Sequence, residues 1–184
     1  DTWEEKLAQA GKEFGVATYT DFDEFLGHDM DAVILANYFH QHAPFAVRAL
    51  NAGKHVMSET SACFTLAEGV ELIRTVEKTG LTYMFAENYP FMVFNQEMRQ
   101  RYLAGDIGEF MYGEAEYVHP YEEGMIRQAD GTGGKKGQPT WRASMPPIWY
   151  CTHDLGPIIQ MCHDRCTMAV GMHTGNRKSP HIGC

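Results

Sequence analysis

The sequence predicts an α/β protein, in which a partial parallel sheet with helices is followed by the start of an α+β region with an open antiparallel sheet. Two observations lead to this prediction. Up to residue 104, short apolar runs alternate with amphipathic helical patterns, as in βαβ units that build a parallel sheet. After residue 108, apolar and polar residues alternate, which favours an antiparallel strand. We therefore expect an incomplete domain over residues 1–108 and the beginning of a second domain over residues 109–184.

The first elements of the chain have clear local signals. Residues 2–14 place apolar side chains at helical spacing, and Gly15 follows as a glycine that ends the helix. Asp21 can cap the short helix that follows it through its side-chain oxygen. Residues 32–36 read Ala-Val-Ile-Leu-Ala without alternation, which is typical of a parallel strand that is buried on both faces.

The next elements continue the βαβ pattern. A helix over 44–50 begins with proline, which the first turn of a helix tolerates, and a glycine separates it from a strand over 55–57. A threonine caps a longer helix over 66–80, which closes on a glycine. A strand over 81–86 and a helix over 91–104 complete the first domain.

The second region is less regular. Residues 110–118 alternate with period two and predict a strand, and residues 122–140 are rich in glycine, lysine and polar side chains, as in a surface loop. We expect a helix over 152–162 and a last strand over 167–173.

Composition excludes two classes of partner. The 184 residues include 24 acidic and 15 basic side chains, and this net charge of −9 argues against binding nucleic acid through its phosphates. No apolar run approaches the roughly 20 residues that span a bilayer, so we expect no membrane segment.

The five cysteines indicate a reducing compartment. Their odd number and irregular spacing do not form a disulfide framework, and we therefore expect a cytoplasmic protein. Cys162, His163 and Cys166 could be read as part of a metal site, but they supply only three ligands and no second pair follows at zinc spacing. A helix end with buried thiols explains them better, and we predict no metal.

Polar residues follow three of the predicted strands. Residues 37–42 come after the first strand, Glu59 and Thr60 after the second, and Glu87 and Asn88 after the third. A parallel sheet binds its ligands beyond the carboxyl ends of its strands. We therefore place a cofactor at this edge of the sheet.

The turn Gly53-Lys-His-Val56, with Glu59 shortly after it, resembles the nucleotide-binding half of the glucose-fructose oxidoreductase, inositol dehydrogenase and MocA family. The resemblance implies a Rossmann-type domain that binds NAD or NADP. That family usually has lysine after this glutamate and uses it in hydride and proton chemistry, whereas this chain has Thr60. The cofactor-binding positions that the resemblance and the strand ends imply are Asp1, Ala36, Asn37, His40, His42, Glu59 and Asn88.

The glycine-rich turn of such a domain is absent from this sequence. A dinucleotide fold normally holds the pyrophosphate on a Gly-x-Gly-x-x-Gly turn at a helix N-terminus, and no such run occurs in the 184 residues. By the resemblance, Asp1 falls on the acid that accepts hydrogen bonds from the adenosine ribose. We therefore expect the chain to begin just after the phosphate-binding unit and to stop inside a second domain.

Downstream segments are similar to the lysine-lacking, NAD-dependent glycosidases of this family. They are Glu87-Asn88, the run from Glu114 to His119, and Thr152-His-Asp-Leu-Gly-Pro157. The likeness implies that His153, Tyr117 and Glu87 are catalytic, with His153 as a base and Tyr117 as the proton carrier at the adjacent carbon. It implies that His119, Trp141 and Arg142 reach the sugar. Asp154 departs from the branch, which commonly has glycine there.

Three functions remain open at this point. The first is an NAD(P)-dependent oxidoreductase that acts on a sugar or polyol hydroxyl. The second is an NAD-dependent glycoside hydrolase that works by transient oxidation of the sugar ring and elimination. The third is a non-catalytic nucleotide- or sugar-binding protein, in which the histidines and carboxylates are hydrogen-bonded packing residues. The resemblance also implies a homo-oligomer, a dimer or tetramer.

Overall fold

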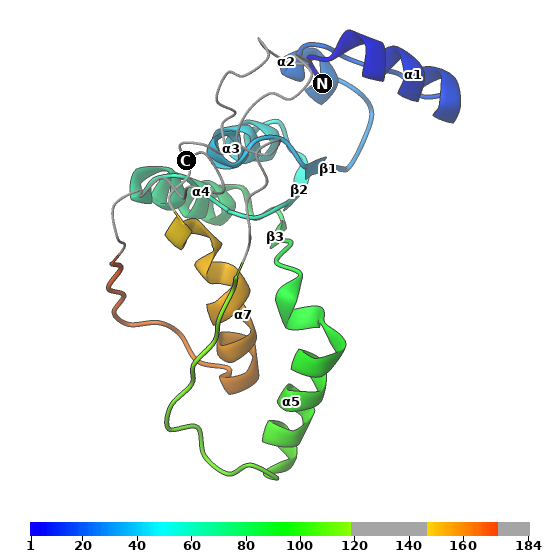
Figure 1. Cartoon of the computed structure of the whole chain (residues 1–184). Coiled ribbons are helices and arrows are strands. Elements are labelled where there is room, and N and C mark those ends of the chain that lie inside the picture. Colours follow the sequence, from blue (N-terminus) through cyan, green and yellow to red (C-terminus); the bar gives the residue numbers. More distant parts are fainter. Residues whose placement is uncertain (119–146, 173–184) are drawn as a thin grey trace, which may run out of the picture. The chain divides into compact units, whose positions relative to one another are not determined.

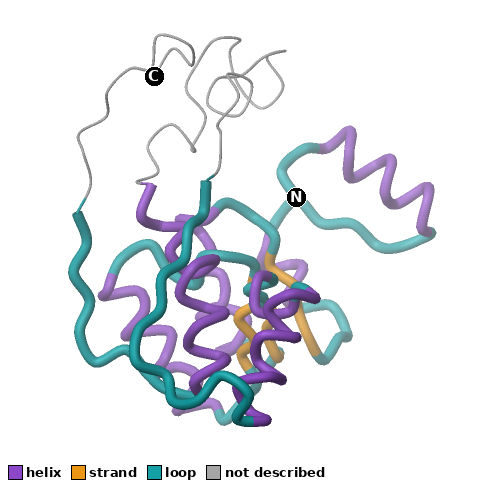
Figure 2. The backbone as a smooth tube through the Cα atoms, turned by 60° about the horizontal axis from the view of Figure 1, so that its bottom comes forward, coloured by secondary structure: helices purple, strands orange, loops and turns teal. Residues whose placement is uncertain are grey.

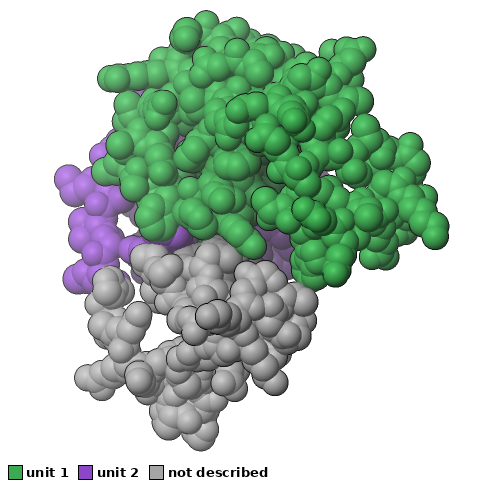
Figure 3. All heavy atoms as spheres, turned by 90° about the horizontal axis from the view of Figure 1, so that it is seen from above, with its two compact units in different colours: residues 1–85 green, residues 86–184 purple. Residues whose placement is uncertain are grey.

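The computed structural model describes residues 1–118 and 147–172, and Figure 1 shows its helices and strands. The chain divides into two compact units, residues 1–85 and 86–184, which Figure 3 colours separately. The division therefore falls before helix α5 (Val93–Ala104), whereas the sequence-based domain boundary was placed after it.

The first unit contains a three-stranded parallel sheet in the order β1-β2-β3. Its strands are β1 (Ala32–Leu35), β2 (His55–Ser58) and β3 (Tyr83–Phe85), shown in orange in Figure 2. Helices α3 (His42–Asn51) and α4 (Leu66–Thr79) pack against each other and follow β1 and β2 in turn. The predicted parallel α/β arrangement is thus confirmed.

One face of the sheet builds the core. Val33 of β1 pairs with Val56 of β2, and both side chains are almost fully buried. They belong to a cluster completed mainly by helix α3 and by α2 (Phe22–Leu26), whose members are Leu26, Val33, Leu35, Ala46, Ala49, Leu50, Val56 and Leu72. The small alanines of α3 let this helix lie close to the sheet.

The opposite face of the sheet corrects the sequence prediction. Burial alternates along β1 and β2, so the expected burial on both faces is wrong in this structure. Ile34, Met57 and Met84 face one another across the three strands, and Ile34 is 72% exposed. Helices α3 and α4 supply a cover for the Val33 face, and no described element buries the Ile34 row.

The Gly53–Val56 signature shapes the amino ends of the strands. Gly53 has a φ of 80°, a left-handed conformation that costs glycine little. The Lys54 ammonium donates to the carbonyl of Met30 at 2.8 Å, just before β1. His55 Nδ1 accepts the Thr82 N–H at 2.9 Å, which ties the start of β2 to the start of β3. The signature therefore fixes where the strands begin.

The helix signals of the first unit are confirmed. Helix α1 (Glu4–Phe14) ends at Gly15 in the left-handed conformation, and Asp21 caps α2 by accepting two backbone N–H groups. Thr65 and Glu68 form a reciprocal capping box at the start of α4, which ends at Gly80.

The second unit is helical in its described residues. A short 3₁₀ turn, η2 (Tyr89–Phe91), precedes α5, and a second turn, η4 (Pro147–Tyr150), leads into α7 (Cys151–Cys162). Helix α7 packs against η2 and α5. The strand predicted over 110–118 is wrong, because these residues form no ladder; so is the described part of the last strand, residues 167–172. Alternation alone supplies no partner strand, and no antiparallel neighbour lies within the described residues.

Candidate active site

A buried pair, Glu87 and His153, lies in the second unit. His153 Nδ1 lies 2.6 Å from Glu87 Oε1, and the two residues are 8% and 6% exposed. The backbone N–H of Tyr89 donates to the same carboxylate oxygen at 3.0 Å. Glu87 enters from the segment after β3 and His153 from the first turn of α7, so the packing of η2 against α7 brings them together.

Three tyrosine rings surround the imidazole. Tyr89 and Tyr150 lie nearly parallel to it, with centroids at 4.5 and 5.2 Å, and Tyr117 meets it edge-on at 4.6 Å. The structure thus gathers the three predicted catalytic residues, His153, Tyr117 and Glu87, into one cluster. Tyr89 and Tyr150 were not selected from the sequence. Tyr89 directly follows the Glu87-Asn88 pair, and Tyr150 precedes His153 by one helical turn.

The carboxylate determines which imidazole nitrogen is open. An ionised carboxylate only accepts hydrogen bonds, so Nδ1 carries the proton that it shares with Glu87. Nε2 is then the basic nitrogen of the neutral ring, and it makes no hydrogen bond to any described residue. This is the arrangement of a base whose tautomer is fixed by an orienting carboxylate.

The imidazole borders an open pocket of about 760 Å³ in the second unit. Its walls come from α5, from residues 107–116 and from α7, and they combine aromatic rings with carboxylates. Tyr89, Tyr102 and Tyr112 contribute rings, and Glu116 and Asp154 contribute acceptors. Apolar walls with a few polar groups are typical of small-molecule sites.

Burial changes the pKa of two groups next to His153. It raises the pKa of Asp154, which His153 lowers and Glu116 raises further. It also raises the pKa of the Cys151 thiol, with a smaller contribution from the Asp154 charge. Both groups are therefore driven toward their neutral forms.

The expected cofactor residues of the first unit gather at the carboxyl ends of the strands. Ala36 and Asn37 follow β1, and Glu59 follows β2, where its backbone N–H donates to the Leu35 carbonyl at 3.0 Å. His40 lies exposed in the 3₁₀ turn η1 (Phe39–Gln41) after β1.

The remaining expected residues lie elsewhere. Asp1 is exposed, and its side chain accepts the backbone N–H of Trp3. Asn88 is exposed at the start of η2 in the second unit. His119, Trp141 and Arg142, the expected sugar contacts, lie outside the described residues.

Comparison with known proteins decides the family. Residues 1–87 match the family described as oxidoreductases with an NAD-binding Rossmann fold. These residues belong to that oxidoreductase family. The match covers the three-stranded sheet and ends at Glu87, so the Gly53–Val56 signature is part of this oxidoreductase domain.

Relatives of known sequence extend the likeness into the second unit. A glycosyl hydrolase family 109 protein of Shewanella sp. strain ANA-3 is 34% identical over 154 residues, which is 78% of this chain and 32% of the relative. The corresponding protein of Shewanella pealeana is 32% identical over 137 residues, 72% of this chain and 28% of the relative. The chain therefore spans about a third of the length of the relatives it matches.

Solved structures give the same fold. Scyllo-inositol dehydrogenase from Lactobacillus casei, determined with bound NAD(H) and scyllo-inositol, is 28% identical, with a TM-score of 0.57 over 59% of this chain and 33% of that chain. Myo-inositol 2-dehydrogenase from Lactobacillus plantarum, 21% identical, also has a TM-score of 0.57, over 61% of this chain and 34% of that chain. At this identity, the likeness to the L. plantarum enzyme shows the fold alone.

The strand ends of this oxidoreductase domain suit a dinucleotide. The side-chain oxygen of Asn37 is buried and has no hydrogen-bond partner, although a buried acceptor normally has one. A cofactor hydroxyl or amide N–H could donate to it. Thr60 stands where the resemblance leads one to expect lysine; it is 7% exposed, and its hydroxyl does not titrate near neutral pH.

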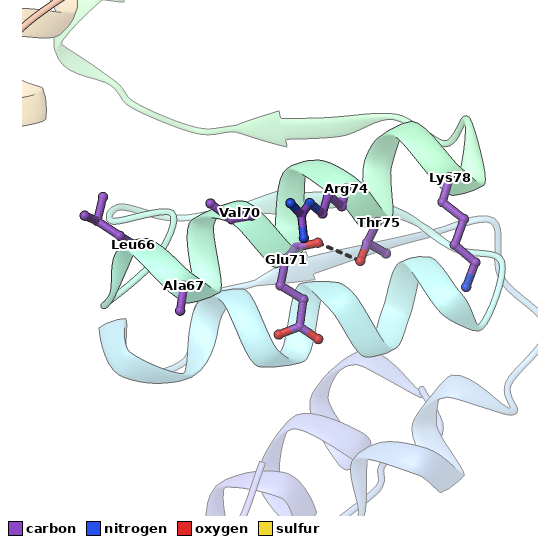
Figure 4. A pocket seen from close by; sticks show the side chains of 7 residues that line it. All are labelled: Leu66, Ala67, Val70, Glu71, Arg74, Thr75 and Lys78. Atoms are coloured by element: carbon purple, nitrogen blue, oxygen red, sulfur yellow. Dashed lines mark hydrogen bonds between the residues drawn. The ribbon is translucent and has the colours of Figure 1, made fainter.

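Two other features of the described residues do not contain expected site residues or a metal cluster. A shallow groove along α4, shown in Figure 4, is lined by Leu66, Ala67, Val70, Glu71, Arg74, Thr75 and Lys78, none of which is an expected site residue. In the described part of the chain, no group of three or more histidine, cysteine or acidic side chains could hold a metal ion. His163 instead lies 2.9 Å from Arg99, and the Cys166 thiol donates to the Met168 carbonyl.

Proposed function

We propose that the protein is an NAD(P)-dependent oxidoreductase that oxidises a hydroxyl group of a sugar or polyol. The observation that carries the proposal is the buried Glu87–His153 pair. Its imidazole borders a pocket, and His153 Nε2 makes no hydrogen bond to a described residue. The family of residues 1–87, which binds NAD, supports the cofactor. The L. casei neighbour, determined with scyllo-inositol, supports a polyhydroxylated substrate.

Alcohol oxidation separates a proton from a hydride. In this proposal His153 Nε2 accepts the hydroxyl proton as the carbon–oxygen double bond forms. Glu87 holds Nδ1–H and stabilises the positive charge that the imidazole acquires. The bound nicotinamide supplies the hydride acceptor. Thr60 cannot replace His153 as the base, so the proton chemistry belongs to the second unit.

The test measures NADH formation by the whole protein with a panel of sugars and polyols. His153→Ala should lower kcat by about 10²- to 10⁴-fold, the usual contribution of a general base. Glu87→Gln should lower kcat as well, because an amide can present its own N–H to Nδ1 and reverse the tautomer. His163→Ala is the matched control, since His163 lies exposed at the other end of α7. Its rate should equal that of the unaltered protein.

Two results would contradict the proposal. Unchanged activity in the His153→Ala variant would assign the base to another residue. Absence of turnover with every substrate, together with intact nucleotide binding, would favour a non-catalytic binding protein instead.

The second candidate function is an NAD-dependent glycoside hydrolase. Tyr117 favours it, because a phenol whose ring contacts the His153 imidazole could move a proton at the carbon next to the oxidised centre. The relatives named glycosyl hydrolase family 109 favour it too. Oxidation acidifies that carbon–hydrogen bond, elimination expels the aglycone, and water addition and hydride return restore the sugar. The net reaction is hydrolysis.

The two activities differ in what accumulates. An oxidoreductase forms NADH in proportion to the oxidised sugar. A glycosidase releases nitrophenol from a nitrophenyl glycoside without NADH build-up, and Tyr117→Phe should abolish that release. Nitrophenol release without NADH would therefore replace our first proposal by the second.

Assembly and location remain proposals. We propose a dimer or tetramer, as the family resemblance implies, to be tested by light scattering of the whole protein. No helix among the described residues is long and apolar enough to cross a bilayer. The four cysteines within the described ranges are all free thiols, which supports a reducing compartment such as the cytoplasm.

A further inference from the structure

His42 lies between two loops at the carboxyl edge of the sheet. It begins helix α3, and it is 0% exposed. Its Nδ1 lies 2.8 Å from the carbonyl oxygen of Ser61, and its Nε2 lies 3.1 Å from the carbonyl oxygen of Asn37. Asn37 follows β1 and Ser61 follows β2, so one imidazole joins the two strand ends.

These contacts leave the ring no nitrogen for a ligand. Carbonyl oxygens only accept hydrogen bonds, so the ring N–H donates to one of these two carbonyls, and the other carbonyl oxygen lies against the second nitrogen. A ring that is fully buried, with a backbone carbonyl against each nitrogen, cannot also touch a cofactor. Its contribution is mechanical, because it sets the separation and orientation of the two loops.

The Asn37 loop ends in an unsatisfied acceptor. The Asn37 side-chain oxygen is buried without a partner, while its amide nitrogen makes only a long contact, 3.5 Å, to Gln41. His42 holds the backbone of this same residue. A buried acceptor without a partner destabilises the protein, and a ligand N–H or O–H that reached it would remove that cost.

We propose that His42 is a positioning residue for the dinucleotide: it fixes the Asn37 and Ser61 loops so that the Asn37 side-chain oxygen accepts a hydrogen bond from the cofactor. The inference rests on the proposed NAD(P)-dependent function. It replaces the sequence-based expectation of direct contact by His42 with an indirect role. Asn37 becomes the contacting residue of this pair.

The experiment measures the Kd for NAD of the whole protein by calorimetry. His42→Phe keeps the aromatic volume but removes both ring nitrogens and their polar contacts, and it should weaken binding about tenfold or more. His42→Gln retains an amide nitrogen with two N–H donors and should recover much of the affinity. Asn37→Ala should weaken NAD binding too, because it deletes the acceptor itself.

The matched control is His55→Phe. His55 lies in the same sheet, at the amino ends of the strands, and donates nothing to the Asn37 and Ser61 loops. It should leave the Kd for NAD unchanged. Thermal denaturation of each variant separates loss of fold from loss of affinity.

The outcomes distinguish this inference from the function on which it rests. A folded His42→Phe variant with the original Kd, or an equal loss in His55→Phe, would overturn the positioning role. If His42→Phe does not fold, Asn37→Ala decides, and an unchanged Kd there overturns the inference. If the unaltered protein itself binds neither NAD nor NADP, the proposed function fails first.

Discussion

Tyr89 supports the Glu87–His153 pair in two ways. Its backbone N–H donates to the carboxylate oxygen that binds the imidazole, and its ring lies nearly parallel to that imidazole at 4.5 Å. Any residue except proline at position 89 supplies the first contact, whereas only an aromatic ring supplies the second. The Tyr89 side chain therefore helps to hold the plane of the His153 ring, together with Tyr150 on which the ring also stacks.

Replacing Tyr89 separates the two contacts. We expect Tyr89→Leu to lower kcat roughly fivefold, because loss of a ring contact worth about 1 kcal/mol frees the imidazole to turn. Tyr89→Phe keeps the ring and should retain most of the activity. Steady-state kinetics with KM measured separately gives the answer; a similar loss in both variants would assign the effect to the phenol hydroxyl instead.

Two thiols should react slowly for an electrostatic reason. Burial raises the pKa of Cys63, with a smaller contribution from Glu68, and burial also raises the pKa of Cys151. A raised pKa lowers the fraction of reactive thiolate at a given pH. At pH 8 we expect iodoacetamide to modify both several-fold more slowly than the exposed Cys166, as followed by mass spectrometry. In denaturing urea the three rates should converge, and unequal rates there would point to local sequence effects.

At the scale of elements, the sequence predicted helix ends well, because capping residues lie next to the helices that they end. Helix α4 has its cap, its capping-box glutamate and its closing Gly80 within sixteen residues, so the sequence alone was sufficient. The exposed Ile34 row and the missing strand over 110–118 depend on which elements lie opposite, and no local pattern contains that information.

The candidate site, like the fold, was predicted only in part from the sequence. His153, Glu87 and Tyr117 were selected by family resemblance, and the structure gathers them. His42 was expected to touch the cofactor, because a histidine at a strand end reads as a ligand contact. In the folded protein two backbone carbonyls instead lie against its ring, and no local sequence pattern indicates this. Tyr150 was missed because its role depends on the helical turn that places it beside His153.

The close approach of α7 to η2 depends on Gly156. A Cβ at this position would lie 3.2 Å from Pro90 Cγ and 3.3 Å from Glu87 Cγ. We expect Gly156→Val to cost about 1–3 kcal/mol of unfolding free energy and to reduce kcat by displacing Glu87 from His153. Urea denaturation and kinetics test both effects. Ile159→Ala, a partly exposed position on the same helix, should leave kcat unchanged; wild-type kcat in Gly156→Val would show that the pair tolerates the displacement.

The exposed row of the sheet gives an element-scale prediction. Ile34, Met57 and Met84 form a continuous apolar strip, and such surface binds apolar dyes and promotes association. In the polypeptide 1–184 we expect Ile34→Thr to reduce dye fluorescence while thermal stability stays close to the original. Val33→Thr, the neighbour on the buried face, should instead destabilise the fold strongly. Equal effects of the two changes would mean that both faces are covered in solution.

At the scale of the whole molecule, the described residues provide only part of a dinucleotide site. The strand ends carry Asn37, His40 and Glu59, which we propose as cofactor-binding residues, but no Gly-x-Gly-x-x-Gly run occurs in the 184 residues. That turn aims backbone N–H groups and the positive end of a helix at the pyrophosphate. Hydrogen bonds to a charged group contribute about 1.5–3 kcal/mol each, so their absence dominates the affinity.

We therefore expect the polypeptide 1–184 alone to bind NAD at least about tenfold more weakly than the inositol dehydrogenase of L. casei, its structural neighbour. Calorimetry on both proteins under the same buffer gives the comparison. In the polypeptide 1–184, Asn37→Ala should abolish the weak residual binding, because the strand ends then lose the acceptor that we propose for the cofactor. Tight NAD binding by this polypeptide would show that another segment holds the pyrophosphate.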